Sequence, residues 1–149
     1  MAHLRDRPYG TTNFLVDFGD GQARSPAGGF SEVIFPVFHA APPAAGADAP
    51  ASVKPEEAAP LPSNRLQLKR GFIGSLDLYA WWHKARSGRA PRRKTLQIHL
   101  LSEDQETVVA TWRFRQVRLV SLSYSPLQAT QGGILVETAE FAFDRMEMR

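Results

Sequence analysis

The sequence predicts a mainly β protein, an antiparallel β-sandwich or barrel of about seven strands with one short α-helix. Three observations support this prediction. Apolar and polar residues alternate in many short segments, which is typical of strands that bury one face. The polar stretch SEDQET has the length of a hairpin loop and separates two such segments. One further segment spaces its apolar residues like a helix.

The alternating segments follow one another along the chain. Leu96, Ile98 and Leu100, for example, alternate with polar residues. Each strand has one apolar face, so the strands must cover a second layer or close on themselves. The predicted strands lie at about residues 13–18, 29–38, 65–69, 95–101, 107–117, 120–124 and 134–144.

We expect a single domain over residues 1–149, because a chain of this length can bury enough apolar surface around one core. At about residues 39–63 a stretch rich in alanine and proline interrupts the alternation. Such a composition cannot form a packed core. Because only about forty residues precede it, we interpret this stretch as a long loop between two strands.

The one helix is predicted to begin at Ser75 and to end before Gly88. Ser75 is expected to cap the N-terminus, and Asp77 lies in the first turn, where the helix dipole favours an acid. Lys84 and Arg86 lie in the last turn, where the dipole favours cations. Gly88 then ends the helix.

This helix has a wide aromatic face. Leu78, Trp82 and Ala85 form an apolar stripe that Tyr79 and Trp81 flank. Adjacent residues on a helix point about 100° apart, so at most one tryptophan can be an exposed platform. We therefore interpret the tryptophan pair as a plug on the β layers. Stacking of a nucleic-acid base on one of them is the alternative.

The formal net charge of +3 arises from one segment. Residues 84–94 carry six basic residues and no acid, which leaves 12 of the 18 basic residues against 15 acidic ones elsewhere. The rest of the chain is therefore slightly acidic. This pattern indicates a local basic patch and not a broad face for nucleic acid.

The sequence shows no catalytic or metal-binding pattern, and we expect neither enzyme activity nor a cofactor. It contains no cysteine, which excludes thiolate nucleophiles and cysteine-ligated zinc. The four histidines lie in separate segments, without a second ligand at helical spacing. The acids of residues 103–106 lie in a polar turn and are not an acid/base pair. GDGQ at residues 19–22 is a turn without a following helix and is not a phosphate-binding loop. No serine lies in a nucleophile elbow.

No apolar run approaches the length of a membrane span, and the first residues are charged where a secretory signal would be apolar. We therefore expect no membrane insertion.

Several segments, in fixed order, resemble one protein family. They are GGFSEV at residues 28–33, LQLKRGFIGSLDLYAWWHKARSG at 66–88 and RRKTLQIHLLSEDQETVVATWRFRQV at 92–117, followed by ILVETAEFAF. Over residues 9–36 and 64–147 the chain resembles the tail tube proteins of contractile phages and the inner tube proteins of extracellular contractile injection systems. The residues that carry this resemblance, as candidates for assembly contacts, are Gly29, Phe30, Ser31, Glu32, Lys69, Arg70, Gly71, Trp81, Trp82, Arg92, Arg93, Trp112, Glu137 and Glu140.

The resemblance implies a structural subunit that forms hexameric rings, stacked into a hollow tube within a contractile sheath. It implies that strands of every subunit build the wall of the lumen, through which protein or DNA cargo passes. The implied partners are further copies of the chain, the sheath protein, and baseplate, spike and tube-terminating proteins. Assembly is expected in the bacterial cytoplasm, and the product is a phage tail or an injection particle that can be released.

Other functions also fit the residues. A tube initiator or a baseplate-proximal tube subunit would share the fold, and so would a secreted ring-forming carrier related to the type VI tube. A nucleic-acid-binding β-barrel would use residues 86–94 and a tryptophan, and its binding would weaken steeply with salt. Rings that persist at high salt would instead favour a tube.

Overall fold

The computed structural model describes residues 2–21, 23–24, 29–40, 63–88 and 93–149. Within them the chain is mainly β with one short helix, as the sequence predicts. In chain order the elements are β1 (Phe14–Asp17), β2 (Glu32–Ile34), β3 (Arg65–Gly71), α1 (Asp77–Arg86), β4 (Lys94–Leu101), β5 (Val108–Tyr124), β6 (Val136–Ala142) and β7 (Arg145–Met148).

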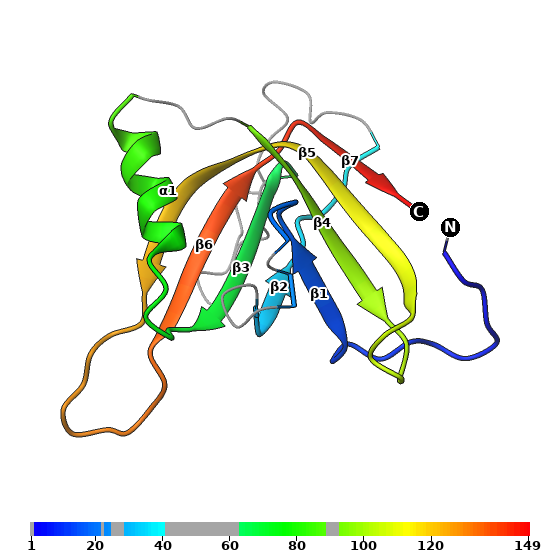
Figure 1. Ribbon diagram of the computed structural model, residues 1–149, viewed down its shortest axis with the longest axis horizontal. Coiled ribbons are helices and arrows are strands. Elements are labelled where there is room, and N and C mark those ends of the chain that lie inside the picture. Colours follow the sequence, from blue (N-terminus) through cyan, green and yellow to red (C-terminus); the bar gives the residue numbers. More distant parts are fainter. Residues whose placement is uncertain (1, 22, 25–28, 41–62, 89–92) are drawn as a thin grey trace, which may run out of the picture.

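The strands pair antiparallel in the order β1-β4-β5-β6-β3-β2, and β7 pairs with β5 (Figure 1). Two layers share β5. Its first half pairs with β4 and β7, and residues 118–124 pair with β6. We call the layer of β1, β4, β7 and the first half of β5 sheet A. The layer of residues 118–124, β6, β3 and β2 is sheet B.

The two strands predicted at residues 107–117 and 120–124 form one continuous strand, β5, which has 17 residues from Val108 to Tyr124. The prediction was wrong because the side-chain alternation changes phase within the strand. Gln116 has a φ of 58°, in the left-handed region that residues other than glycine seldom adopt. Phe114 and Val117 are therefore both buried although they are three residues apart. In Figure 1, β5 curves over the top of the molecule and so passes from sheet A to sheet B.

The predicted strand at residues 134–144 is also corrected, because it ends at Ala142 and is followed by a separate strand, β7. The chain leaves sheet B at this point and crosses to sheet A. Phe143 is buried between the layers, and the Asp144 N–H donates a hydrogen bond to the Arg115 carbonyl at 3.0 Å. β7 then continues along β5.

The predicted strand at residues 29–38 is shorter than expected. Only Glu32–Ile34 pairs with β3, because Pro36 has no N–H to donate and so cannot continue the ladder. Beyond β2, the ring of Phe35 lies 5.0 Å from that of Trp112. Of the predicted Ala/Pro-rich loop at about 39–63, residues 41–62 lie outside the described part of the chain. The strands on either side of it, β2 and β3, are paired neighbours.

The inner faces of the two sheets bury a common core. On sheet B, Leu66, Leu68 and Phe141 are fully buried. On sheet A, Leu96 and Phe114 are fully buried. These residues come from the predicted alternating segments, so the alternation identified their inward positions. In β5 it did not do so throughout, since Val120 is exposed and Leu119 is buried.

Helix α1 begins differently from the prediction. Leu76 precedes its first turn, and the structure shows no side-chain hydrogen bond that caps it. The hydroxyl of Ser75, the predicted cap, donates instead to Asp77 Oδ1 at 2.9 Å. The helix ends as predicted, since Gly88 adopts a φ of 77° two residues after Arg86. The buried residues of the helix are Leu78 and Trp81, so the predicted stripe through Trp82 is displaced by one position.

Candidate assembly site

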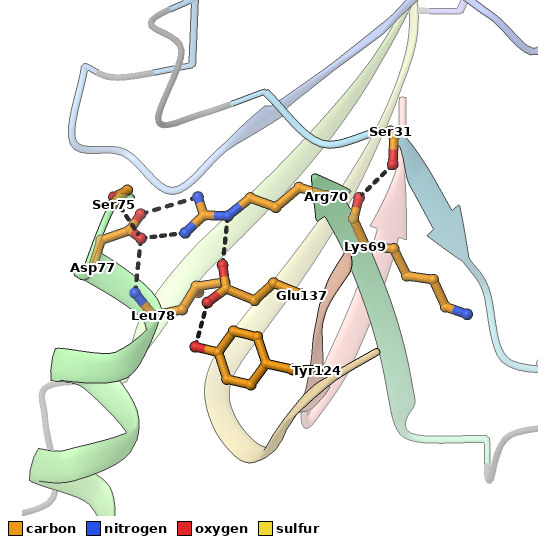
Figure 2. Close-up of polar contacts among 8 residues, drawn as sticks. All are labelled: Ser31, Lys69, Arg70, Ser75, Asp77, Leu78, Tyr124 and Glu137. Atoms are coloured by element: carbon orange, nitrogen blue, oxygen red, sulfur yellow. Dashed lines mark hydrogen bonds and ion pairs between the residues drawn. The ribbon is translucent and has the colours of Figure 1, made fainter. Parts of the chain in front are cut away.

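A buried ion cluster joins α1 to sheet B (Figure 2). Arg70 of β3 lies directly opposite Glu137 of β6, and their side chains are 2% and 0% exposed. Arg70 Nε donates to Glu137 Oε1 at 2.8 Å, and the Tyr124 hydroxyl donates to Glu137 Oε2 at 2.7 Å. The Arg70 guanidinium also forms an ion pair with Asp77 in the first turn of α1. One guanidinium thus bridges two strands and the helix.

Three groups of this cluster, Arg70, Asp77 and Tyr124, have pKa values that favour their usual charge states. Burial raises the pKa of Asp77, but hydrogen bonds from Arg70 and Ser75 outweigh this effect, and the pKa lies below its ordinary value. Burial and the hydrogen bond to Glu137 raise the pKa of Tyr124 to about 12. Burial lowers the pKa of Arg70, but its hydrogen bonds to Asp77 and Glu137 outweigh this effect. The pKa of Arg70 therefore lies above its ordinary value. Around neutral pH, the Asp77 carboxylate and the guanidinium therefore remain charged and the phenol remains protonated.

This arrangement fixes the position of α1. A buried charge is tolerated only when its partners are present, because a single charge left in the core is strongly unfavourable. Arg70 and Glu137 were singled out from the sequence, but Tyr124 was not. Asp77 was noted only for its place in the first helical turn. The sequence gives no signal that these four side chains meet.

The structure brings together two of the segments that carry the resemblance. The Ser31 N–H and hydroxyl both donate to the Lys69 carbonyl, at 2.8 and 3.1 Å (Figure 2). Glu32 lies opposite Lys69 on the outward face of sheet B. The Arg70 guanidinium carbon lies 5.2 Å from the centre of the Phe30 ring, a cation–π contact. Residues 30–32 and 69–70 therefore form one connected edge of the molecule.

Other singled-out residues are spread over sheet B and its margins. Gly29 is exposed next to that edge. Gly71 lies next to Ile134, and a Cβ at this position would be in ordinary contact with Ile134 Cγ2, at 3.4 Å. Glu140 lies on the outward face of sheet B, opposite Gln67. None of these three residues belongs to the ion cluster.

Two further singled-out residues, Trp112 and Arg93, lie on or near sheet A. Trp112 is half-buried and its ring lies against Phe35. Arg93 forms an exposed ion pair with Asp144 at 3.3 Å. Arg92 lies outside the described residues, as does much of the basic segment that follows the helix.

The two adjacent tryptophans of α1 have different surroundings. Trp81 is 9% exposed and packs against Phe18 and Phe141, at ring-centre distances of 5.7 and 5.2 Å. Trp82 is partly buried, and the Arg86 guanidinium lies 5.0 Å from its ring. Trp81 is thus a plug, as expected. Trp82 instead contacts a side chain of its own helix.

Sheet B has an unpaired strand edge at each end. Among the described residues, no strand pairs with the outer edge of β2 or with the side of residues 118–124 that faces away from β6. Unpaired edges of this kind readily accept strands from other chains. The two edges belong to different strands, and α1 packs against β5.

No helix in the described part of the chain is long and apolar enough to cross a membrane. Among the described residues, no three histidine, cysteine, aspartate or glutamate side chains are grouped as they would be around a metal ion.

The fold places the chain among mainly β, antiparallel proteins, with an unpaired strand edge at each end of sheet B in the described part of the chain. The family follows from sequence. The model for the T4-like virus tail tube protein gp19 matches residues 10–147, and the chain belongs to this family. It is a structural tail tube protein and not an enzyme. Among curated proteins, none has a matching sequence.

Solved structures with a similar fold come from contractile particles. A chain of the PVC sheath/tube terminator of an extracellular contractile injection system, in the extended state, superposes with a TM-score of 0.70 at 20% identity over 97% of this chain and 98% of that chain. A chain of the anti-feeding prophage cap gives a TM-score of 0.69 at 19% identity over 100% and 95%. A chain of the PVC sheath–tube complex gives 0.66 at 19% identity over 95% and 91%. At these identities the likeness establishes the fold.

Proposed function

We propose that this chain is the repeating subunit of the inner tube of a contractile tail or injection particle. Copies close into hexameric rings, and the rings stack around a lumen. The observation that carries the proposal is the pair of different unpaired edges on sheet B of a chain that belongs to a tail tube family. Two different edges favour head-to-tail assembly, which closes into a ring when the rotation between copies permits.

Strand directions support this closure. Each strand of sheet B is antiparallel to its neighbour, so β2 and β5 run in opposite directions. Rotation of a copy about a ring axis keeps the direction of its strands relative to that axis. The β2 edge of one copy would therefore meet the residue 118–124 edge of the next in antiparallel orientation, and the sheet would continue around the ring.

The outward face of sheet B suits a water-filled bore. Glu32, Lys69, Thr138 and Glu140 lie on this face and are exposed or partly exposed. Acidic and basic side chains are interspersed, and Glu32 lies directly opposite Lys69. A hydrated wall of this kind would let protein or DNA cargo pass without a continuous apolar surface to hold it.

The proposed partners follow from the particles in which similar folds occur. Chains of this fold are present in a sheath–tube complex, a tube-terminating cap and a baseplate. The partners that we propose for this chain are a sheath protein around the tube, a terminator protein at one end of it, and baseplate and spike proteins at the other end. Assembly takes place in the bacterial cytoplasm. A tube initiator or baseplate-proximal subunit, which shares the fold, is the close alternative.

Electron microscopy of the purified chain tests the proposal. Rings with sixfold symmetry, or stacks of them, are expected in negative stain, and they should persist at high salt because backbone pairing and apolar contacts are little screened. A chain that remains a folded monomer at high concentration contradicts the proposal. Binding to single-stranded DNA that weakens steeply with salt would favour the nucleic-acid-binding alternative.

Hydrogen exchange tests the edges themselves. On assembly, amides of residues 32–34 and 118–124 should exchange more slowly than in dissociated subunits, because the new pairing protects them. The turn at residues 102–107 belongs to sheet A and is the internal control, with unchanged exchange. Protection of β7 without protection of β2 would place the ring interface on sheet A instead.

A further inference from the structure

An apolar groove lies between the two layers at the Glu32 end of β2. It has a volume of about 500 Å³ and separates the edge strand of sheet A, β1, from the edge strand of sheet B, β2. Its lining is mostly apolar, and Glu32 is the one charged residue that contributes to it among those described. The principal apolar lining residues are Tyr9, Phe14, Val33, Phe35, Leu100 and Trp112.

A projecting loop carries apolar side chains that are not buried within its own chain. Residues 125–135 connect β5 to β6 and extend well beyond the sheet in Figure 1, where they form the orange loop. Leu127 is 86% exposed and Ile134 is 79% exposed. The loop contains no charged residue. Exposed large apolar residues on an uncharged projection indicate a surface that is covered by a partner.

We propose that the 125–135 loop of one copy docks in the β1–β2 groove of the adjacent copy, with Leu127 against its apolar lining. This inference rests on the proposed ring and adds the contact that locks neighbouring subunits together. The loop and the groove are the two different surfaces of one head-to-tail contact. Every copy has both, so the same contact can repeat around the ring.

The proposed pairing of strands brings the loop to the groove. In antiparallel pairing, the Tyr124 end of β5 in one copy lies beside the Glu32 end of β2 in the next. The loop begins directly after Tyr124, and Ser31, Glu32 and Val33 border the groove. Loop and groove therefore meet at the same end of the joined edges. Uncharged apolar side chains of the loop also match the character of the lining.

The loop of the same chain is poorly placed to fill its own groove. β5 and β2 are the two ends of four-stranded sheet B, with β6 and β3 between them. At the usual spacing of neighbouring strands, these two ends are separated by roughly 14 Å. A second copy placed on the β2 edge brings a loop directly to the groove.

Disulfide cross-linking tests the contact, because the chain has no cysteine of its own. Leu127→Cys in one copy is mixed with Thr11→Cys or Ser31→Cys in a size-tagged second copy, and the assembled rings are oxidised mildly. Each variant has a single cysteine, so a product of mixed size reports a contact between copies. The expected yield is at least about tenfold above that of the matched control, Leu127→Cys mixed with Ser87→Cys at the far end of α1.

The outcomes separate the docking from the ring. Rings in which neither groove cysteine is linked above the control level overturn the docking and leave the proposed tube intact. A chain that forms no rings overturns the proposed function, and the docking fails with it. If Leu127→Cys is linked efficiently to Ser87→Cys instead, the loop docks elsewhere and the inference is wrong.

Charge substitutions give a second test. Leu127→Asp changes an exposed residue, so the isolated subunit should fold as before. It should raise the concentration needed for half-assembly by at least about tenfold, because a charge cannot enter an apolar groove without cost. Gln128→Asp adds the same charge on the same loop and is the matched control. Equal effects of the two variants would show a general charge effect and contradict the docking.

Discussion

The molecule treats the two openings between its layers differently. At one, α1 covers the gap between Phe18 of sheet A and Phe141 of sheet B with the ring of Trp81. The ion cluster around Arg70 holds the helix in this place. At the other, between β1 and β2, the described residues leave an apolar groove. The first opening is thus closed by the chain's own helix, and under our proposal a neighbouring copy fills the second. Stability is expected to depend on the first opening and assembly on the second.

The largest effect is expected from Arg70→Met, which removes the cation between Glu137 and Asp77. Glu137 would remain buried without its ion-pair partner, so the free energy of unfolding should fall by about 3–5 kcal/mol. Denaturant unfolding of the dissociated subunit measures this loss. The double variant Arg70→Met/Glu137→Leu should recover part of it, since no buried charge remains. A single variant as stable as the wild type would show that the cluster does not hold the helix.

The next effect separates the two tryptophans. Trp81→Ala should cost about 3–5 kcal/mol, because it leaves a cavity among buried aromatic rings. Trp82→Ala should cost about 1 kcal/mol, because that ring is only partly buried. Thermal or denaturant unfolding of both variants provides the comparison. If Trp82→Ala were the more damaging change, α1 would have to pack through its other face.

At the β1–β2 groove, the substitution Thr11→Arg should leave stability almost unchanged and impair assembly. Thr11 is exposed at the margin of the groove, so the free energy of unfolding should change by less than about 0.5 kcal/mol. Assembly into rings should require several times more protein. Light scattering against concentration measures assembly, and Gln105→Arg in the β4–β5 turn, away from the groove, is the control. Impaired assembly in both variants would remove the contrast between the two openings.

The smallest effect concerns pH. The pKa of Asp77 is lower in the folded protein than in the unfolded chain, so its contribution is present above the ordinary pKa of about 3.9. It is lost as pH falls from there through the lower, folded-state value. Because the carboxylate is half-exposed, this contribution should be below about 1 kcal/mol. Unfolding curves from pH 5 downward should show a shallower decline for Asp77→Asn. An identical decline would mean that the ion pair adds nothing.

The sequence was sufficient to predict the class of fold and most strands, because alternating apolar residues report directly which face is buried. The strand predictions fail at two places where the backbone changes course and the residue types do not indicate it. Gln116 changes the phase of β5, and the crossing after Ala142 sends the last strand to the other layer. Neither has a characteristic residue type. The shorter β2 could have been predicted, since Pro36 marks its end.

The candidate site was only partly predictable. The resemblance pointed to Arg70 and Glu137, but a strand pairing across 67 residues of sequence is needed before they meet. Tyr124 joins them through a third strand, and Asp77 through the helix. The loop of residues 125–135 was not singled out from the sequence, because exposure of Leu127 is a property of the folded chain. Contacts between distant segments are therefore the part that sequence patterns do not contain.

The continuity of β5 has a mechanical consequence. Its 17 residues belong to both layers, so a force that reaches sheet A is transmitted to sheet B through covalent backbone bonds. The layers cannot slide past one another unless this strand bends or its hydrogen bonds break. A tube made of such subunits would therefore resist shear between its two layers when a force pushes it along its axis.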